Sequence, residues 1–219
     1  MGISIVTGSN RGIGLELCRQ LQQRGRAVVA VCRSASAELE ALGVRIEAGI
    51  DVSDEAGITR LVEALGAEPI ELLLHNAGIL ERVELEQLDA DSIRRQFEIN
   101  ALAPLRLTHA LLDQLGAGSK LAIVTSLMGS MADNGSGGSY GYRMSKAALN
   151  AAGVSLARDL ASRGVAVAIL HPGMVRTEMT GFRGIPVEES ARGMLERIDA
   201  LDPESSGTFR HADGRELPW

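Results

Sequence analysis

Short apolar runs, rich in β-branched residues, alternate along the chain with longer segments whose apolar residues recur at helical spacing. Most of the short runs are apolar throughout, which is typical of strands with both faces covered by helices. They predict strands near residues 3–7, 27–32, 44–48, 70–75, 120–125, 165–170 and 207–210. The longer segments predict helices near residues 12–24, 35–42, 54–65, 89–115, 140–163 and 187–200.

This alternation is the pattern of repeated strand, helix, strand units, which build a parallel sheet. The predicted fold class is α/β: a Rossmann fold with a doubly wound parallel sheet of about seven strands and helices on both faces. A chain of 219 residues suffices for one substantial core, so we expect residues 1–219 to form a single domain. The glycine- and serine-rich stretch 129–139 predicts a loop between a strand and a helix, not a domain linker.

Composition narrows the possible partners. The net charge is −6 and basic residues are scattered among acids, which argues against a nucleic-acid surface. No apolar stretch approaches the roughly 20 residues of a membrane helix, and the start of the chain lacks the pattern of a secretory signal. The two cysteines, Cys18 and Cys32, indicate neither a disulfide framework nor a zinc site. We therefore expect a cytoplasmic protein with no membrane, nucleic-acid or metal partner.

A glycine-rich turn, TGSNRGIG at residues 7–14, stands where the first predicted strand gives way to the first helix. Glycines let the backbone approach a ligand closely, and the helix start offers N–H groups to a phosphate. The spacing differs from the G-x-G-x-x-G fingerprint, and a purely structural turn explains it equally well. Its position after the first strand favours a dinucleotide site, because the nucleotide crevice of such sheets lies there.

The second predicted strand ends in AVVAVCRSAS, where an acid would select NAD through its ribose hydroxyl. Cys32 occupies that place, Arg33 follows it, and Arg11 stands in the glycine turn. Two guanidinium groups suit a ribose 2′-phosphate, so our hypothesis is NADP(H) in preference to NAD(H). The alternative is that both are ordinary solvated arginines in an arginine-rich chain.

Tyr142 and Lys146 stand four residues apart in a predicted helix, so their side chains share one face. A free phenol has a pKa of about 10, and a general acid or base works best nearer ambient pH. We therefore expect the Lys146 ammonium to lower the pKa of Tyr142. Ser126, at the end of a predicted strand, is placed to orient a carbonyl oxygen. The alternatives are a chance tyrosine–lysine pair and a serine that only satisfies a loop amide.

Six motifs follow one another in an order and spacing that resembles the short-chain dehydrogenase/reductase family. They are TGSNRGIG, HNAG at 75–78, FEINALAPL around Asn100, VTSLMGS around Ser126, YRMSK at 142–146 and HPGMVRT at 171–177. The resemblance covers essentially the whole chain. The stretches GGSYGYRMSKAALN and GTFRHADGRELPW are more narrowly similar to the branch of C-factor and sniffer-type carbonyl reductases. The resemblance implies an NADP(H)-dependent enzyme that reversibly reduces an aldehyde or ketone.

The resemblance also implies roles for individual residues. Tyr142 would give the proton, with Lys146 lowering its pKa and binding the ribose. Ser126 would orient the carbonyl, and Asn100 would hold a water in a proton relay. Adenine would contact Asp51 and Val52, and the nicotinamide carboxamide would lie by Gly173, Val175 and Thr177. The full implied cofactor set is Gly8, Asn10, Arg11, Gly12, Ile13, Gly14, Arg33, Asp51, Val52, Asn76, Ala77, Gly78, Tyr142, Lys146, Pro172, Gly173, Val175 and Thr177.

Two departures from the family pattern concern His75, which replaces an asparagine of many members, and the long separation of Ser126 from Tyr142. The second requires loop 129–139 to bulge and leaves Ser130 as an alternative to Ser126. The short region 178–187 predicts an open substrate pocket, with Met179 and Phe182 either lining it or packing the loop.

Two further predictions concern a rival function and assembly. A nicotinamide-binding signalling or sensor protein of C-factor type is the rival function, although a pure binder has no need for a proton donor. The long helices at 89–115 and 140–163 are expected to pair with their copies in a homodimer or homotetramer, as the resemblance implies.

Overall fold

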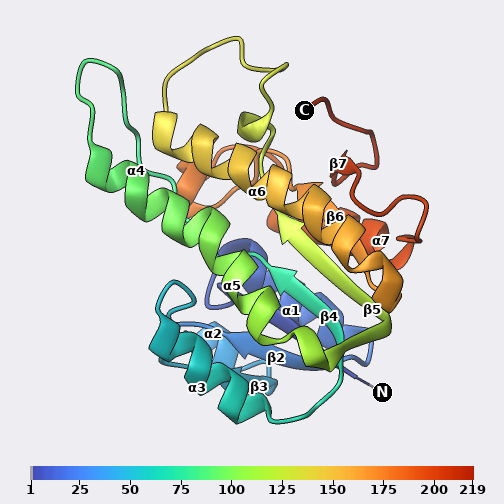
Figure 1. Cartoon of the computed structure of the whole chain (residues 1–219). Helices are drawn as coiled ribbons and strands as arrows, with labels where there is room; N and C mark the ends of the chain where they lie inside the picture. The colour runs from blue at the N-terminus through green and yellow to red at the C-terminus, as the bar shows by residue number, and fades with distance from the viewer. Residues whose placement is uncertain (1) are drawn as a thin grey trace.

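The computed structural model describes residues 2–219, which form one seven-stranded sheet between two layers of helices (Figure 1). All neighbouring strands are parallel, in the order β3-β2-β1-β4-β5-β6-β7. The doubly wound α/β sheet expected from the sequence is confirmed. The strands are β1 (Ile3–Thr7), β2 (Ala27–Val31), β3 (Arg45–Glu47), β4 (Ile70–His75), β5 (Leu115–Val124), β6 (Ala166–His171) and β7 (Phe209–His211).

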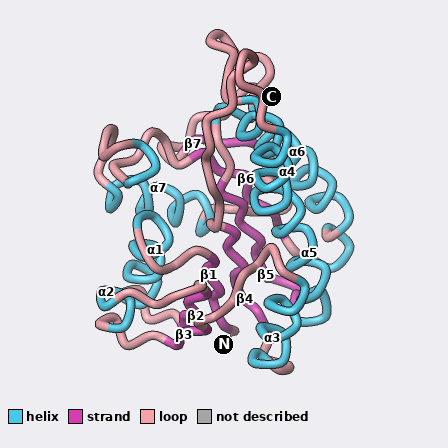
Figure 2. The backbone as a smooth tube through the Cα atoms, turned by 90° about the vertical axis from the view of Figure 1, so that its left-hand side faces the viewer, coloured by secondary structure: helices cyan, strands magenta, loops and turns pink. Residues whose placement is uncertain are grey.

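Helices cover both faces of this sheet (Figure 2). One layer holds α1 (Gly12–Gln23), α2 (Ala37–Glu40) and α7 (Val187–Asp199). The other holds α3 (Glu55–Leu65), α4 (Ala90–Phe97), α5 (Ala103–Ala110) and α6 (Tyr140–Asp159). Successive side chains of a strand point to opposite faces, so Ile5 packs into the α3–α6 core and Val6 into the α1–α7 core. Both layers are apolar, which explains why the strands are apolar throughout.

The predicted helix at 89–115 is the main difference between the sequence prediction and the structure. It is divided into α4, a π-helical turn at Glu98–Leu102, α5 and a short 3₁₀ turn at Leu112–Gln114. β5 begins at Leu115, before the predicted strand 120–125, because Leu115 pairs with Ile70 ahead of a register shift. A π-helical turn adds a residue without interrupting the apolar pattern, so periodicity alone gave no sign of it.

The chain runs outward from β1 to β3 and then returns to place β4 beside β1. At such a reversal the carboxyl ends of the two central strands flank a crevice. Thr7 joins them, since its hydroxyl accepts hydrogen bonds of 3.1 Å from the backbone N–H groups of Asn76 and Ala77. In return, the Asn76 side-chain Nδ2 donates hydrogen bonds to the carbonyl oxygens of Thr7 (3.0 Å) and Gly8 (3.1 Å).

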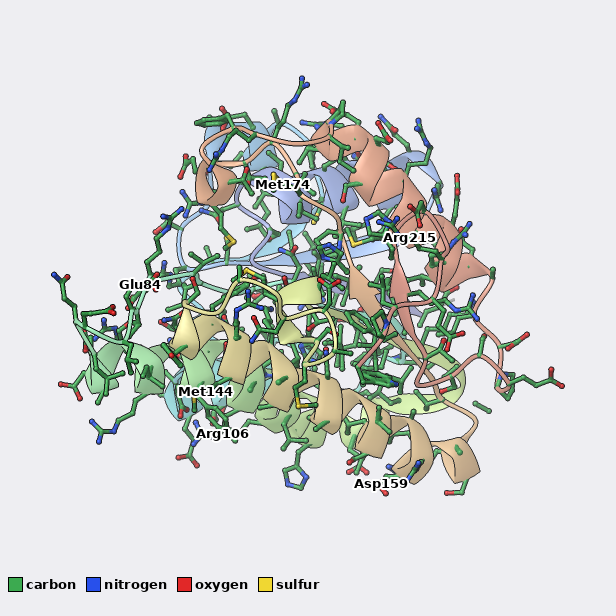
Figure 3. The ribbon with its side chains drawn as sticks, turned by 90° about the horizontal axis from the view of Figure 1, so that it is seen from above. Glu84, Arg106, Met144, Asp159, Met174 and Arg215 are labelled. Carbon is green, nitrogen blue, oxygen red and sulfur yellow. The ribbon has the colours of Figure 1, made fainter. Side chains whose placement is uncertain are left out.

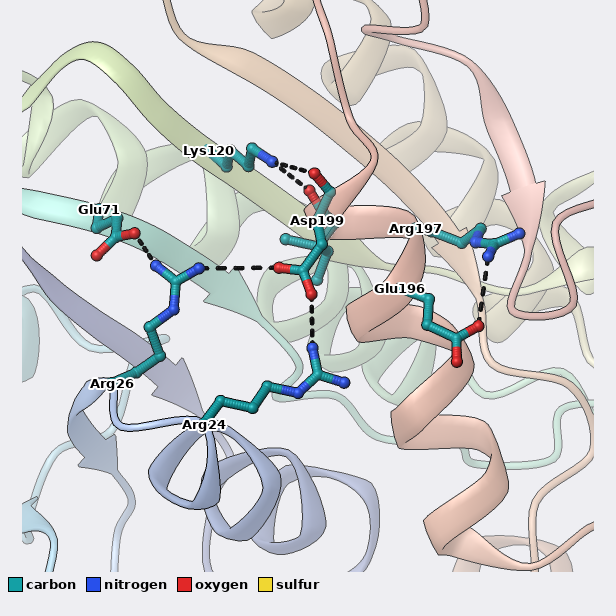
Figure 4. Close-up of polar contacts among 8 residues, drawn as sticks. Arg24, Arg26, Glu71, Lys120, Glu196, Arg197 and Asp199 are labelled. Carbon is teal, nitrogen blue, oxygen red and sulfur yellow. Dashed lines mark hydrogen bonds and ion pairs between the residues drawn. The ribbon is translucent and has the colours of Figure 1, made fainter.

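Charged side chains link the amino edge of the sheet to the end of α7 (Figure 4). Asp199 lies 2.6 Å from Arg24 and 3.8 Å from Arg26, and Arg26 also pairs with Glu71. Lys120 donates to the main-chain carbonyls of Ile198 (2.6 Å) and Asp199 (2.8 Å). A lysine there satisfies carbonyls that the last turn of a helix leaves unpaired.

The C-terminal tail returns along β7. The backbone N–H of Leu217 donates to Phe209, and the Trp219 ring stacks on the Phe209 ring with centroids 5.3 Å apart. Ala132 donates its N–H to the main-chain oxygen of Trp219 at 2.9 Å, so the tail lies against the loop that follows β5. Within residues 2–219, no helix has the length and apolar character to cross a bilayer.

Candidate active site

A cleft of about 500 Å³ opens at the carboxyl edge of the sheet. This volume lies within the range of cofactor and ligand pockets. Loops after β1, β2, β4 and β6 line it together with α6, so residues distant in sequence meet there. The predicted site residues that line it are Gly8, Asn10, Arg11, Gly12, Ile13, Arg33, Asp51, Val52, Asn76, Ala77, Gly78, Tyr142, Lys146, Pro172 and Thr177.

The glycine turn forms one wall of this cleft. Gly8 has a φ of +67°, which favours glycine, and a Cβ on Gly14 would lie 2.2 Å from the Gly8 oxygen. Gly14 therefore supports the turn from behind without lining the cleft. No side chain caps the start of α1. Its first N–H groups, and the positive end of its dipole, suit a phosphate group.

The two arginines assigned to the 2′-phosphate differ in their surroundings. Arg33 lines the cleft, and its side chain makes no hydrogen bond or ion pair with any residue from 2 to 219. Arg11 forms an ion pair with Glu178, which reaches across from the loop after β6. Both members of that pair are more than half exposed. The Arg33 guanidinium is thus free to bind a ligand, whereas Arg11 would first have to break its ion pair with Glu178.

Asp51 lies in the cleft near Arg33 and is held by the next turn of chain. Its Oδ1 accepts from the Ser53 hydroxyl (2.6 Å) and the Ser53 N–H (2.9 Å). Hydrogen bonding to Ser53 lowers the pKa of Asp51, with a smaller contribution from the charge of Arg33. The carboxylate is therefore ionised and held in place, and its contact with adenine stays a prediction.

Tyr142 and Lys146 meet in the cleft, as their spacing on one helix predicts. The lysine nitrogen lies 5.8 Å from the centre of the phenol ring and donates a 3.0 Å hydrogen bond to the Val124 carbonyl. The exposed fractions are 7% for Tyr142 and 4% for Lys146, so both polar groups are nearly removed from water. Nearly complete burial of two ionisable groups at a cleft is characteristic of functional sites.

The pKa of the Tyr142 phenol differs from the expectation. Burial raises it, and the neighbouring Ser126 hydroxyl opposes that effect only in part. Burial lowers the pKa of Lys146 to about 8. As the pH rises, Lys146 therefore loses its charge before the Tyr142 phenol ionises. This explains why, without a cofactor, the ammonium does not lower the pKa of Tyr142. Tyr142 keeps its proton at neutral pH, the state that a proton donor needs.

Ser126, and not Ser130, is the hydroxyl beside Tyr142. It directly follows the end of β5 and Thr125, and its Oγ accepts from the N–H of Met128 at 3.1 Å. Ser130 accepts from the N–H of Asp133 at 3.1 Å and so stabilises the turn of the next loop. Ser126 itself does not line the cleft, and its carbonyl-orienting role stays a prediction.

Asn100 is fully buried in the π-helical turn and does not line the cleft. Its Oδ1 accepts from the N–H of Ile79 (2.8 Å), and its Nδ2 donates to the Ile79 carbonyl (2.9 Å) and the Ser145 hydroxyl (3.0 Å). These contacts occupy both side-chain donors, so the side chain tethers Ile79 to α6. The water-holding role stays a prediction.

Gly173 and Val175 also lie behind the cleft. Gly173 begins the loop after Pro172, and Val175 is 2% exposed and bridges to Ile185. They shape the loop whose outer residues Thr177 and Glu178 reach the cleft. Met179 and Phe182 line the cleft and are 49% and 67% exposed, which favours lining over packing of the loop.

His75, the departure from the family pattern, is structural here. Its Nε2 lies 2.9 Å from the Thr108 hydroxyl, which itself donates to Pro104. The histidine is therefore the donor. Burial lowers its pKa to about 3, so the ring is neutral and joins β4 to α5 away from the cleft.

Sequence reasoning missed several residues of the site. Thr7 holds the strand ends together, and its only signal is its place at the end of β1. Glu178 and Ile79 line the cleft, and no pattern in the sequence distinguishes them from other loop residues.

A parallel sheet with a phosphate-binding turn and a buried tyrosine–lysine pair at one cleft defines a dinucleotide-binding oxidoreductase. The family model for short chain dehydrogenases matches residues 3–185, and the chain belongs to that family. It is 43% identical over 226 positions, across 100% of both chains, to 1-hydroxy-2-glutathionyl-2-methyl-3-butene dehydrogenase of Rhodococcus sp. (strain AD45).

Two further comparisons bear on the branch of the family. C-signal of Myxococcus xanthus is 48% identical over 155 residues, which cover 69% of this chain and 93% of that protein. The crystal structure of the NADPH-bound carbonyl reductase from chicken fatty liver superposes with a TM-score of 0.89 at 27% identity, covering 100% of this chain and 99% of that one. The resemblance based on the six motifs is confirmed.

Proposed function

We propose that this oxidoreductase uses NADP(H) to reduce an aldehyde or ketone reversibly to an alcohol, with Tyr142 as the proton donor. The observation that carries the proposal is the placement of a protonated, buried phenol and an adjoining lysine in the same cleft as an unpaired arginine. Tyr142 and Lys146 suit proton transfer to a carbonyl oxygen. Arg33 suits the ribose 2′-phosphate, which distinguishes NADP from NAD.

The residues of the cleft fit a dinucleotide. The glycine turn and the uncapped start of α1 suit its pyrophosphate, and Arg33 suits the 2′-phosphate. Asp51 and Val52 would meet adenine. Pro172 and Thr177 line the same cleft as Tyr142 and Lys146, and they would contact the nicotinamide. When bound, the nicotinamide supplies or accepts the hydride.

Within this cleft each residue has one task. Tyr142 transfers its proton to the carbonyl oxygen during reduction and takes it back during oxidation. Ser126 donates a hydrogen bond that orients the same oxygen. Lys146 is held in place by the Val124 carbonyl, and its remaining hydrogens are available to ribose hydroxyls. A cationic nicotinamide ring would favour the phenolate form of Tyr142, and ribose hydroxyls that accept hydrogen bonds from Lys146 would favour its ammonium form. We therefore expect the pKa of Tyr142 to fall only in the complex.

The preference for NADP(H) depends mainly on Arg33. Among residues 2–219 its side chain forms no ion pair, although Asp51 is near, and its guanidinium is thus available for bidentate hydrogen bonds. The NADPH in the chicken carbonyl reductase is consistent with this choice.

The test is a panel of aldehydes and ketones with NADPH or NADH, followed by the loss of the reduced-cofactor absorbance. The oxidation of hydroxyalkyl glutathione conjugates is tested with NADP+ or NAD+ and followed by the gain of the same absorbance, because the Rhodococcus relative is a dehydrogenase of such a compound. Turnover with NADPH supports the proposal, and preference for NADH contradicts the cofactor assignment.

Similarity to C-signal keeps a signalling protein as the second candidate. A protein of that kind would bind NADPH and show no turnover across the whole panel. The buried Tyr142, Lys146 and Ser126 favour the enzyme, because binding alone requires no proton donor.

We further propose a homodimer or homotetramer formed through α4, α5 and α6. Apolar residues remain exposed on this outer side, with Phe97 at 44%, Leu105 at 40% and Met144 at 53%, and Met144 lies there with Arg106 in Figure 3. Sedimentation velocity would test this, and a strict monomer would exclude it.

Both cysteines are free thiols, which suits the proposed cytoplasmic location.

A further inference from the structure

The chain from Ile79 to Glu81 follows β4 beyond the sheet, and its first residue, Ile79, lines the cleft. No strand within residues 2–219 pairs with this segment, yet the backbone groups of Ile79 and Glu81 are hydrogen-bonded to side chains. Asn100 accepts from the Ile79 N–H and donates to the Ile79 carbonyl. Gln96 does the same for Glu81, with Oε1 accepting from the N–H and Nε2 donating to the carbonyl, both at 3.1 Å.

These two side-chain amides act together as a substitute for a neighbouring strand. They are spaced by four residues on one helical face, and they pair with alternate residues of an extended segment. Each amide gives its second hydrogen to a serine hydroxyl, Ser145 for Asn100 and Ser92 for Gln96. Both are fully buried with every donor used. The segment is thereby fixed at two points.

Gln96 also touches the start of the helix that carries Tyr142. α4 and α6 lie side by side (Figure 1). A Cβ on Gly141 would lie only 2.5 Å from Gln96 Nε2, so glycine is needed there for the amide to fit. The N–H of Tyr140 donates to the Val83 carbonyl at 3.1 Å. The segment following Glu81 is thus connected to the start of α6 both through Gln96 and directly.

We propose that Gln96 is a positioning residue that sets the distance between the 79–83 segment and Tyr142, and so shapes the substrate half of the cleft. This inference rests on the proposed carbonyl reduction. Asn100 holds Ile79, next to the cofactor-lining Gly78, whereas Gln96 holds Glu81, two residues farther from the cofactor. Loss of the Gln96 contacts should therefore impair carbonyl turnover more than NADPH binding.

Gln96→Met is the main test, because methionine has similar length and no hydrogen-bonding amide. We expect kcat/KM for the best carbonyl to fall about 10-fold or more, since small displacements of reacting groups are costly. NADPH affinity, measured by fluorescence titration, should fall much less than kcat/KM. Hydrogen exchange of the peptide containing Glu81 should become about 10-fold faster, because a buried hydrogen bond is lost.

Two variants separate this role from a general loss of structure. Gln96→Glu keeps the length and the acceptor for the Glu81 N–H, so it should retain more activity than Gln96→Met. Arg95→Gln is the matched control: it removes a contact to the Glu81 side chain and leaves the backbone pair intact. Its kcat/KM should stay within about twofold of the unmodified protein.

The proposal is overturned if Gln96→Met keeps kcat/KM within about twofold, or if NADPH affinity falls as much as kcat/KM. Should Gln96→Met fail to fold, Gly141→Ala is the second variant, because it displaces the Gln96 amide without removing it. It must likewise lower kcat/KM more than it lowers NADPH affinity. If the unmodified protein reduces no carbonyl, the proposed function fails; unchanged exchange at Glu81 in Gln96→Met would instead refute the tether.

Discussion

At the amino edge of the sheet, Arg24 and Arg26 share the carboxylate of Asp199, and these side chains are about one-third to one-half exposed. At the carboxyl edge, Tyr142 and Lys146 are nearly buried, and Lys146 has no acidic partner among residues 2–219. The amino edge thus uses charge to join α7 to the sheet. The carboxyl edge keeps ionisable groups in an environment that disfavours their charge, which is a common feature of functional sites.

The only two lysines of the chain show this contrast directly. Both donate to main-chain carbonyls, and burial lowers the pKa of both. For Lys120 the nearby Asp199 opposes that lowering, whereas burial acts alone on Lys146. Proximity to a carboxylate therefore separates a lysine that stabilises the fold from one suited to chemistry.

The largest expected effect is at Tyr142. Tyr142→Phe removes the proton donor and should lower kcat/KM for carbonyl reduction by about 10²–10⁴-fold. NADPH affinity and the melting temperature should change little, because the ring still fills its site. Steady-state kinetics and a fluorescence titration check both halves of this expectation. Retained turnover would show that another group gives the proton.

Arg33→Ala should produce the next largest effect. Loss of a charge-assisted contact to the 2′-phosphate should weaken NADPH binding by about 10–100-fold, with NADH binding unchanged. Arg11→Ala serves as the comparison and should weaken NADPH less, because Arg11 is already paired with Glu178. Equal weakening of NADPH and NADH by Arg33→Ala would refute the assignment.

The buried Lys146 should make stability depend on pH at the alkaline side. Its pKa is about 8 in the folded protein against 10.5 in the unfolded chain, so the unfolded state binds more protons between these values. The free energy of unfolding should then rise with pH from about 8 to 10.5, by at most about 1.4 kcal/mol per pH unit.

Denaturant titrations across this pH range measure the rise, and Lys146→Met should lose most of it. Lys120→Met is the matched control and should retain the rise, since Lys146 is intact. An identical pH profile for Lys146→Met and the unmodified protein would mean that the ammonium is solvated in the folded state.

The smallest effect is expected at the amino edge. Asp199→Asn removes two exposed ion pairs and should reduce stability by about 1 kcal/mol or less. Lys120 bonds to the main chain of Asp199, and that contact persists in the variant. Urea unfolding measures the change, and kcat/KM should not move. A substantial loss of activity would show that the two edges are coupled.

Local patterns in the sequence account for most of what could be predicted. β1 and β4 have the predicted bounds, because each is a continuous apolar run between turn residues. Tyr142 and Lys146 were predictable from their spacing on one helix. The partner of Arg11 was not, because Glu178 lies 167 residues away on a loop with no periodicity.

The pairing of Gln96 with Glu81 was missed for a related reason. Amide side chains that replace a strand leave no apolar pattern, and the π-helical turn between Gln96 and Ala103 shifts which residues share a face. The pKa of Tyr142 was mispredicted because its burial depends on the whole assembled cleft.

The tail beside β7 has a practical consequence for handling the protein. An affinity tag joined after Trp219 would begin next to Ala132, in the loop between Ser126 and α6, on the side of the sheet where the strands end. Gly2 lies at the opposite edge, beside Pro69 and Glu71 (Figure 1). Tags, surface tethers and fusion partners are therefore best attached at the amino end, where they leave substrate access free.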